Sequence, residues 1–326
     1  MDRRTFMGAM TASMIAAPLA AIAQKAAIVR RIGVLSEEAP PTQAEMTEEA
    51  SPLRALGWVE GKNLLVERRY ANGRGELVRP FAEELVRLKV EIIATLGTPA
   101  TLAAKNATNT IPILIWAAGD PVATGLVTSL SRPGGNITGL AMLGPELDAK
   151  RLALLRELLP GLLRVGVLEE SANPYSRARR SGLEQTCRSL GIQPIFVGAA
   201  AESELENAIT ELARRGAQAL FVPSDALLIN GRVPLMAAAS KHALPTVAVD
   251  RRFLAEGALA ILDISWAEQD RRFASFVDRI LRGAKPAELP MEQPTRFELG
   301  INLKTAKALG ITMPQSLLLR ADEVIQ

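Results

Sequence analysis

The stretch Val90–Gly125, VEIIATLGTPATLAAKNATNTIPILIWAAGDPVATG, contains two short apolar runs rich in β-branched residues, at 91–96 and 111–117. Each run is followed by a small polar residue and a proline, Thr98-Pro99 and Asp120-Pro121. Proline is favoured at the first helical position, and threonine or aspartate before it can cap free N–H groups. The pattern predicts two buried parallel strands, each leading into a helix. Ligands of such sheets bind at the edge where the strands end.

The same alternation of strand and helix continues on both sides of this stretch. RIGVL at 31–35, LLVERRY at 64–70 and the segment 137–142 have the composition of strands. The segments 77–89 and 148–159 have the apolar spacing of amphipathic helices. Alternating elements of this kind predict an α/β fold built on a parallel sheet.

The pattern then starts again in the second half of the chain. RVGVLEE begins at Arg164, 133 residues after RIGVLSE begins at Arg31. Pro245, in LPTVAVD, likewise stands 133 residues after Pro112. The shared offset predicts two tandem Rossmann-like lobes with parallel sheets, and a single long sheet with coincidental similarity is the alternative. The 326 residues suffice for two domains of moderate size.

Composition limits the chemistry that the chain can perform. Its net charge is +3, and the basic residues are scattered, so nucleic acid is not an expected partner. The densest basic run, RARR at 177–180, is predicted to be the solvated face of a helix. Cys187 is the single cysteine and His242 the single histidine, which excludes an intrachain disulfide and a thiolate metal cluster. No metal and no cofactor are expected, and His242 is predicted to end a helix.

The N-terminus has the features of an export signal. Arg3 and Arg4 precede an apolar run that ends in Ala21-Ile22-Ala23. This arrangement predicts a secretory signal peptide over residues 1–23 and a periplasmic mature protein. DRRTFM also fits the twin-arginine export pattern, with an ordinary secretion signal as the alternative.

Polar residues that follow strands and can begin helices are the candidate ligand contacts. Helix N-termini favour anions, and the carboxylates among these residues favour cations, so the set suits a zwitterion such as an amino acid. Each residue taken singly is also explained as a plain helix cap. The residues expected to bind ligand are Ser36, Thr98, Pro99, Ala100, Asp120, Asn173, Ser224, Asp225 and Asp250.

Catalytic motifs are absent from the sequence. It has no G-x-S-x-G elbow, no G-x-x-x-x-G-K-[ST] loop and no G-x-G-x-x-G after the first strand. An enzyme that uses carboxylates between the lobes as acid and base is therefore the weaker alternative. Trp58, Trp116 and Trp266 are explained by core packing at least as well as by ligand stacking.

Taken together, these segments resemble a known family. LGTPA, the DPV segment, SRPGGNITGL and the C-terminal run from Ile280 to Ile325 are similar to the substrate-binding proteins of ABC transporters, in the group that includes tryptophan- and tyrosine-binding components. The resemblance covers about Arg31 to Ile325. The chain departs from it at Asp263-Ile264-Ser265, where many relatives have a Ser-Tyr-Gly-like segment, which removes an aromatic from the expected cleft wall.

The resemblance implies a type I periplasmic-binding fold with three hinge crossings. Lobe one would combine 31–142 with 254–292, and lobe two 143–253 with 293–326. Thr98, Pro99, Ala100 and Asp120 would face Asn173, Ser224 and Asp225 across the cleft.

The function that we expect is that of a monomeric periplasmic component of an ABC importer, without catalytic activity. It would bind a small polar solute, with amino acids among the candidates, and partner a permease and an ATPase. A ligand-sensing module for a membrane receptor is the alternative from another class.

Overall fold

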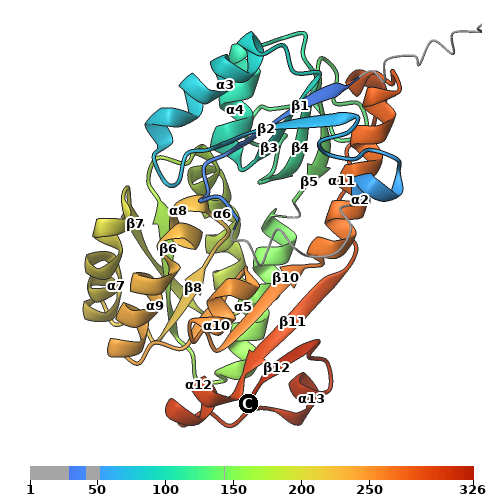
Figure 1. The fold of residues 1–326 in the computed structure, drawn as a ribbon. Helices are drawn as coiled ribbons and strands as arrows, with labels where there is room; N and C mark the ends of the chain where they lie inside the picture. Colours follow the sequence, from blue (N-terminus) through green and yellow to red (C-terminus); the bar gives the residue numbers. More distant parts are fainter. Residues whose placement is uncertain (1–28, 42–51, 143) are drawn as a thin grey trace, which may run out of the picture.

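The computed structural model describes residues 29–41, 52–142 and 144–326. The expected signal peptide at 1–23 lies outside the described residues. Two separate sheets form two lobes, one above the other in Figure 1. The alternative of one long sheet is therefore wrong, and the tandem arrangement predicted from the 133-residue offset is confirmed.

The first lobe is a five-stranded parallel sheet with the order β2-β1-β3-β4-β5. Helices α3 and α4 lie on one face of it, and α11 lies on the other (Figure 1). Its elements are β1 (Arg30–Ser36), α2 (Pro52–Ala55), β2 (Leu64–Tyr70), η1 (Gly75–Leu77), α3 (Val78–Arg87), β3 (Ile92–Leu96), α4 (Thr98–Ala107), β4 (Ile113–Ala118), β5 (Ile137–Ala141), α11 (Trp266–Leu281) and η3 (Pro286–Glu288).

The second lobe is a seven-stranded sheet with the order β12-β11-β10-β9-β8-β6-β7. Apolar clusters cover both of its faces. Its elements are α5 (Gly144–Leu158), β6 (Arg164–Glu170), α6 (Pro174–Ser189), β7 (Gln193–Ala199), η2 (Glu202–Glu204), α7 (Leu205–Arg214), β8 (Ala219–Val222), α8 (Ala226–Asn230), α9 (Arg232–Lys241), β9 (Thr246–Ala248), α10 (Arg251–Ala255), β10 (Ala260–Ile264), β11 (Phe297–Asn302), α12 (Leu303–Ala308), α13 (Gln315–Leu318) and β12 (Glu323–Ile325).

The internal repeat is visible in the way the strands are ordered. β1 lies between β2 and β3, and β6 lies between β7 and β8. The two repeated prolines, Pro112 and Pro245, also make the same hydrogen bond in their respective sheets. The carbonyl oxygen of Pro112 accepts from the N–H of Ile93 at 2.8 Å, and that of Pro245 accepts from the N–H of Leu220 at 2.9 Å. Proline has no N–H to donate, so it stands at the start of each strand, where only its carbonyl is needed.

The expected division of the C-terminal part is wrong for one strand. β10, predicted to return to lobe one as part of 254–292, pairs in parallel with β9 in the second sheet. β11 then runs antiparallel to β10, so the second sheet is not purely parallel. The chain reaches the first lobe one element later, with the amphipathic helix α11. Its buried face, which includes Phe273, Phe276 and Val277, covers the first sheet.

Two of the expected helix starts also differ in the structure. The N-cap of α4 is Gly97, with φ of 94°, and Thr98 is already the first helical residue. After Asp120 the chain forms a turn instead of a helix, because the Asp120 carboxylate binds the N–H groups of Val122 and Ala123 at 2.9 and 3.0 Å within a short coil. This is the turn that aspartate makes with its own following backbone.

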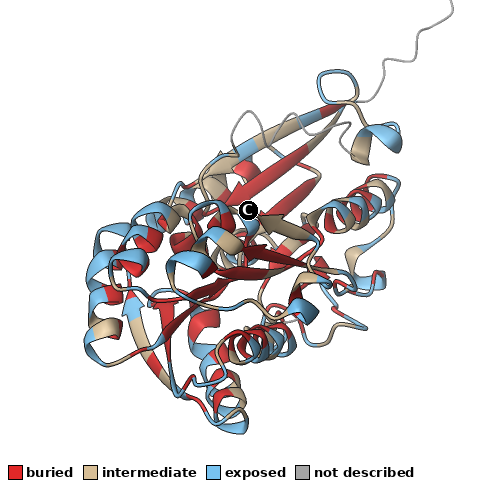
Figure 2. Cartoon of the chain, turned by 90° about the horizontal axis from the view of Figure 1, so that it is seen from below, coloured by how far each residue is buried: buried red, intermediate tan, exposed pale blue. Residues whose placement is uncertain are grey.

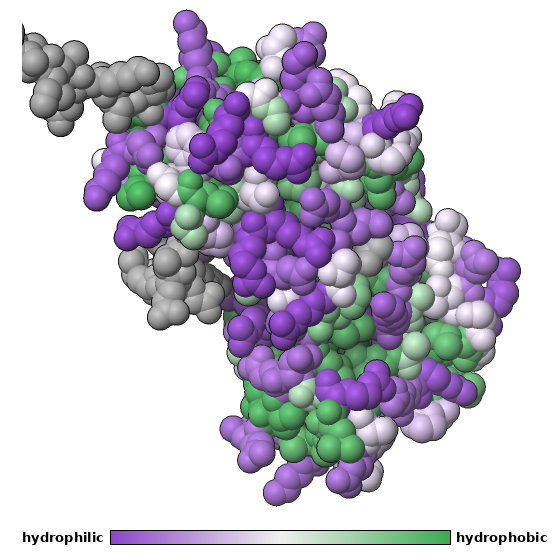
Figure 3. All heavy atoms as spheres, turned by 90° about the vertical axis from the view of Figure 1, so that its right-hand side faces the viewer, coloured by the Kyte–Doolittle hydropathy of each residue, from purple (hydrophilic) through white to green (hydrophobic). Residues whose placement is uncertain are grey.

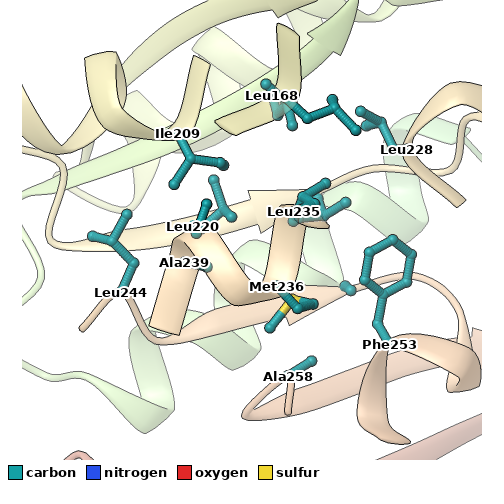
Figure 4. Packing of buried hydrophobic residues seen from close by; sticks show 14 of the residues in the cluster. Leu168, Ile209, Leu220, Leu228, Leu235, Met236, Ala239, Leu244, Phe253 and Ala258 are labelled. Atoms are coloured by element: carbon teal, nitrogen blue, oxygen red, sulfur yellow. The ribbon is translucent and has the colours of Figure 1, made fainter. Parts of the chain in front are cut away.

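The core lies on both faces of the two sheets, where Figure 2 shows buried strands between helices with exposed outer surfaces. In the second lobe, Leu220 on β8 packs with Leu235 and Met236 of α9 and with Phe253 of α10 (Figure 4). Burial of such side chains is the main source of folding free energy, at roughly 25 cal/mol per Å² of apolar surface.

Asn302, the last residue of β11, binds both α12 and α10 of the second lobe. We expect replacement of its side chain to destabilise the fold. Its side-chain oxygen accepts from the N–H of Thr305 at 3.0 Å, and its amide donates to the buried carbonyl of Leu254 at 3.1 Å. Asn302→Ala removes a helix cap and one of two hydrogen bonds to the Leu254 carbonyl, which also accepts from the N–H of Gly257 at 3.2 Å, so the free energy of unfolding should fall by about 0.5–2 kcal/mol. Urea titration measures this, with the exposed Asn106→Ala as the control that should stay within about 0.5 kcal/mol of the wild type.

Candidate functional site

A cleft between the two lobes contains a cavity of about 80 Å³. The carboxyl ends of β3 and β4 and the start of α4 form its first-lobe wall. The starts of α5, α6, α8 and α10 form most of the opposite wall. Strand ends and helix starts therefore meet at this cleft, as the sequence pattern predicted.

Six of the nine residues predicted to bind ligand line this cleft: Thr98, Pro99, Asn173, Ser224, Asp225 and Asp250. Ser36, Ala100 and Asp120 are not among the lining residues. Ser36 ends β1 with its hydroxyl oxygen bound by the N–H of Glu38 at 3.0 Å. Ala100 is buried in the core of the first lobe, and Asp120 caps its own turn. The structure therefore does not bring these three residues to the cleft wall together with the other six.

Asp225 is held rigidly at the start of α8. One carboxylate oxygen accepts from the N–H of Leu227 at 3.1 Å, and the other accepts from the side-chain amide of Asn173 at 2.9 Å. Asn173 in turn caps α6 by accepting from the N–H of Tyr175 at 3.0 Å. Both caps are buried. The caps expected from the sequence thus exist in the second lobe, where they also fix each other across the cleft wall.

Two buried arginines have N–H groups that no other described residue binds. Arg151, on α5, donates to the Leu262 carbonyl at 2.7 Å and to Asp148 at 3.1 Å, but its Nη2 has no partner. Arg179, on α6, has only a 3.5 Å contact to the carbonyl of Ser224, and its Nε and Nη2 are unpartnered. Buried donors are almost always paired in native proteins. A ligand with an anionic group fits this requirement.

Arg179 overturns the prediction that the run 177–180 is a solvated helix face. Arg177 and Arg180 are exposed, but Arg179 is buried and lines the cleft. Its guanidinium lies 5.4 Å from the centre of the Tyr175 ring, one helical turn earlier. The side chains at 175 and 179 share one face of α6 because residues four apart on a helix are neighbours.

Tyr175 reaches from the second lobe to the end of β4 in the first. A Cβ placed on Gly119 would stand 2.4 Å from two atoms of the Tyr175 ring, and one on Gly144 would stand 1.7 Å from its hydroxyl. The Tyr175 ring therefore fits at this place only because positions 119 and 144 are both glycine. Burial raises the pKa of the Tyr175 hydroxyl, and that hydroxyl has no hydrogen-bond partner among the described residues.

Acidic side chains gather at another part of the cleft. Burial, and then the Asp225 carboxylate, raise the pKa of Glu37 to about 7. Burial and a hydrogen bond with Asp225 raise the pKa of Glu170, behind the cleft wall, to about 10. At neutral pH Glu170 is therefore protonated, and Glu37 is divided between both forms. One oxygen of each of these two side chains is buried and has no partner within the described ranges.

Polar contacts also join the lobes at the rim of the cleft. Arg252 binds Glu38 of the first lobe at 3.1 Å and Asp250 of its own lobe at 2.7 Å. The side-chain oxygen of Asn230 accepts from the N–H of Ala39 at 2.9 Å. Hydrophilic side chains likewise cover much of the face shown in Figure 3, with hydrophobic ones gathered toward its lower part. The lobes therefore touch through polar groups at these positions, in addition to the Tyr175 ring against Gly119.

An aromatic side chain does line the cleft, although the sequence departure at 263–265 suggested its loss. Trp266 follows that segment and is held by a hydrogen bond from its indole N–H to Asp263 at 3.0 Å. Trp116 instead stacks on Phe273, and Trp58 donates to Asp278, as packing residues do. Core packing therefore explains two of the tryptophans and not Trp266.

Glu37, Arg151, Tyr175 and Arg179 are cleft residues that the sequence reasoning missed. Tyr175 stands two residues after the predicted cap Asn173, and Arg179 stands one turn further on the same helix face. The spacing of Tyr175 and Arg179 relative to Asn173 was the sequence signal that could have identified both residues. Arg151 carried none, because an arginine in an amphipathic helix usually faces solvent.

The single cysteine and the single histidine both lie away from the cleft. In the part of the chain that the structure describes, no three His, Cys, Asp or Glu side chains are placed to hold a metal ion. Burial raises the pKa of the Cys187 thiol to about 12, so it remains a thiol at neutral pH. His242 ends α9, as predicted, and contacts the Thr210 hydroxyl at 3.1 Å. No helix of the described part of the chain is long and apolar enough to cross a membrane.

Comparisons with known proteins agree with this architecture. The family model for ABC transporter substrate-binding proteins matches residues 42–325. A curated tyrosine-binding protein of Clostridioides difficile is 28% identical over 259 residues, which cover 79% of this chain and 74% of the relative.

Solved structures show the same two-lobed fold. A conserved domain protein from Vibrio cholerae matches with a TM-score of 0.85 and 26% identity over 91% of this chain and 99% of its own. An ABC domain from Streptococcus pneumonia in complex with L-Trp matches with a TM-score of 0.83 and 24% identity over 91% and 100%. A ligand-free, open substrate-binding protein with adhesive properties from Clostridium difficile matches with a TM-score of 0.65 and 26% identity over 91% and 100%. With the family model covering most of its length, the chain belongs to the ABC transporter substrate-binding protein family.

Proposed function

We propose that this chain is the solute-binding component of an ABC importer and that it binds an amino acid in the cleft between its lobes. The observation that carries this proposal is the set of buried polar atoms without partners in and beside the cleft. They include donors of the cations Arg151 and Arg179 and an acceptor of the acid Glu37. A ligand that carries both an anionic and a cationic group satisfies all of them, and an α-amino acid is the smallest common solute of that kind.

The apolar part of the cleft wall supports a ligand with a sizeable side chain. Leu96, Met142, Ile229 and Trp266 line the same space as the charged groups. Pockets of this composition bury the apolar body of a ligand and orient it with a few polar contacts. The names of the relatives, a tyrosine-binding protein and a domain bound to L-Trp, make L-tyrosine and L-tryptophan the first candidates.

Ligand binding is proposed to close the lobes by a hinge motion. The lobes are in contact here through Tyr175 against Gly119 and through Arg252 with Glu38. The lower TM-score of 0.65 against the open, ligand-free relative, at the same 91% coverage, fits a different placement of the lobes. The contacts of Tyr175 with Gly119 and of Arg252 with Glu38 would then form on closure.

We further propose that the protein is periplasmic and is exported through its N-terminal signal, with Arg3-Arg4 directing twin-arginine export. It would act as a monomer together with a permease and an ATPase. The chain would act by binding alone, without catalysing a reaction. A ligand-sensing module that docks on a membrane receptor is the second candidate, because the same cleft and closure would serve it.

A thermal-shift screen of the chain against amino acids, small carboxylates, purines and sugars tests the ligand class. A true ligand at a hundredfold excess over its Kd should stabilise the protein by about 2.7 kcal/mol and raise the midpoint visibly. We expect hits among α-amino acids. Hits confined to sugars or purines would contradict the proposed ligand class.

A further inference from the structure

Glu37 and Asp225 face the same cleft from different lobes. Glu37 directly follows β1 of the first lobe, and Asp225 caps α8 of the second. Both are buried and line the cleft. Their electrostatic repulsion is strong enough to be the second cause of the raised pKa of Glu37. Closing the lobes therefore brings two acidic groups toward each other in a poorly solvated place.

No cation is bound to either of these two carboxylates among the described residues. The carboxylate of Asp225 is fixed by the N–H of Leu227 and the amide of Asn173, both of them neutral groups. Glu170, on β6, is protonated at neutral pH and hydrogen-bonded with Asp225, so it is a third neutral partner and brings no positive charge. Arg252 is already bound by Glu38 and Asp250. Arg179 is the cation that acts on Glu170, but it is not bound to Glu37.

We propose that Glu37 and Asp225 hold the ligand's cationic group between them, so that the lobes close fully only over a solute that carries an ammonium group. This inference rests on the proposed function and adds to it a gate for closure. A metal ion is the less suitable occupant, because no three acidic, His or Cys side chains of the described residues are placed to bind one. An ammonium group needs only hydrogen-bond acceptors, which the unpartnered Oε2 of Glu37 and the Asp225 carboxylate supply.

The gate acts because it distinguishes the two lobe arrangements. A ligand can shift an equilibrium only through a difference in its interaction with the two states. With the lobes apart, both acids are solvated and indifferent to each other. With the lobes together, they repel unless a proton or a ligand cation lies between them. Anionic solutes of similar shape are thereby excluded, which gives the cleft its selectivity for amino acids over the corresponding carboxylic acids.

The ligand-free protein provides the first test, by small-angle X-ray scattering. Because the pKa of Glu37 is raised from 4.5 to about 7 in the closed arrangement, closure takes up a proton between these values and is disfavoured above them. We expect the ligand-free wild type to become more compact as the pH falls from 8 to 5.5. Glu37→Gln should be compact throughout, and the exposed first-lobe control Glu76→Gln should follow the wild type. A radius of gyration that changes neither with pH nor with the Glu37→Gln substitution would overturn the proposal.

Calorimetry with three probes provides the second test. We expect L-tyrosine to bind the wild type at least a hundredfold more tightly than 3-(4-hydroxyphenyl)propionate, which lacks the ammonium group. Glu37→Gln should reduce this ratio to less than tenfold, and an unchanged ratio would overturn the gate. Tyramine, which keeps only the cation, should retain measurable dependence on Glu37. If no amino acid binds, the proposed function fails, while the scattering experiment still decides whether the two acids oppose closure.

Discussion

Replacing Gly119 by alanine should prevent the lobes from closing and lower the affinity for an amino acid ligand ten- to a hundredfold. The added Cβ would stand 2.4 Å from ring atoms of Tyr175, which comes from the opposite lobe. A contact that short forces a shift of one lobe against the other, and overpacking of this kind costs about 1–3 kcal/mol. The ring cannot turn aside, because Gly144 and the buried surroundings of Tyr175 hold it in place.

The separation of closure from folding makes this variant informative. Gly119 and Tyr175 lie in different lobes, so the clash exists only when the lobes meet. The thermal midpoint of ligand-free Gly119→Ala should therefore stay near that of the wild type while calorimetry shows the loss of affinity. Gly161→Ala is the matched control, because its Cβ would meet nothing within 4 Å. Unchanged affinity in Gly119→Ala would show that ligand binding does not require the contact of Tyr175 with Gly119.

Arg179→Met should lower the affinity for L-tyrosine by about a hundredfold or more. The guanidinium is buried and lines the cleft, and its Nε and Nη2 have no partner among the residues that the structure describes. If these groups bind the ligand's carboxylate, methionine keeps the volume but removes charge-assisted hydrogen bonds worth about 1.5–3 kcal/mol and leaves the carboxylate buried beside an apolar side chain. Calorimetric titration of both proteins measures the ratio of the dissociation constants.

Arg177→Met is the control for this change, because it removes the same charge from the same helix at an exposed position. It should bind L-tyrosine as the wild type does. The ligand-free thermal midpoint of Arg179→Met should fall little, since the guanidinium has only one long hydrogen bond, of 3.5 Å, to lose. Equal affinities for Arg179→Met and Arg177→Met would exclude Arg179 as the group that recognises the anion.

The fold was predictable from the sequence because its signals are local and repeated. β-branched runs such as 92–96, followed by residues that end a strand, identify parallel strands without any knowledge of tertiary contacts. The repeat of RIGVLSE and Pro112 at a fixed offset then gives the second lobe. Where the prediction was wrong, at β10, the sequence offers no local difference. A buried strand has the same composition whichever sheet accepts it.

The site was predictable where a residue stands between the end of a strand and the start of the next helix. Asn173 and Asp225 were found because they are N-caps, and a polar residue directly before a helical segment is recognisable in the sequence. Asp120 also stands before a segment that could be helical, but its carboxylate binds the backbone of a turn instead. Arg179 was misjudged because an exposed and a buried arginine in RARR look alike in sequence. Only the docking of α6 against the first lobe decides between them.

The measurement that tests the account most directly is small-angle X-ray scattering of the chain with and without the best ligand from the thermal-shift screen, at pH 8. The account predicts that saturating ligand lowers the radius of gyration, that Gly119→Ala prevents this change, and that Gly161→Ala does not. Ligand binding that leaves the radius of gyration of the wild type unchanged would contradict closure of the two lobes over a solute held between them.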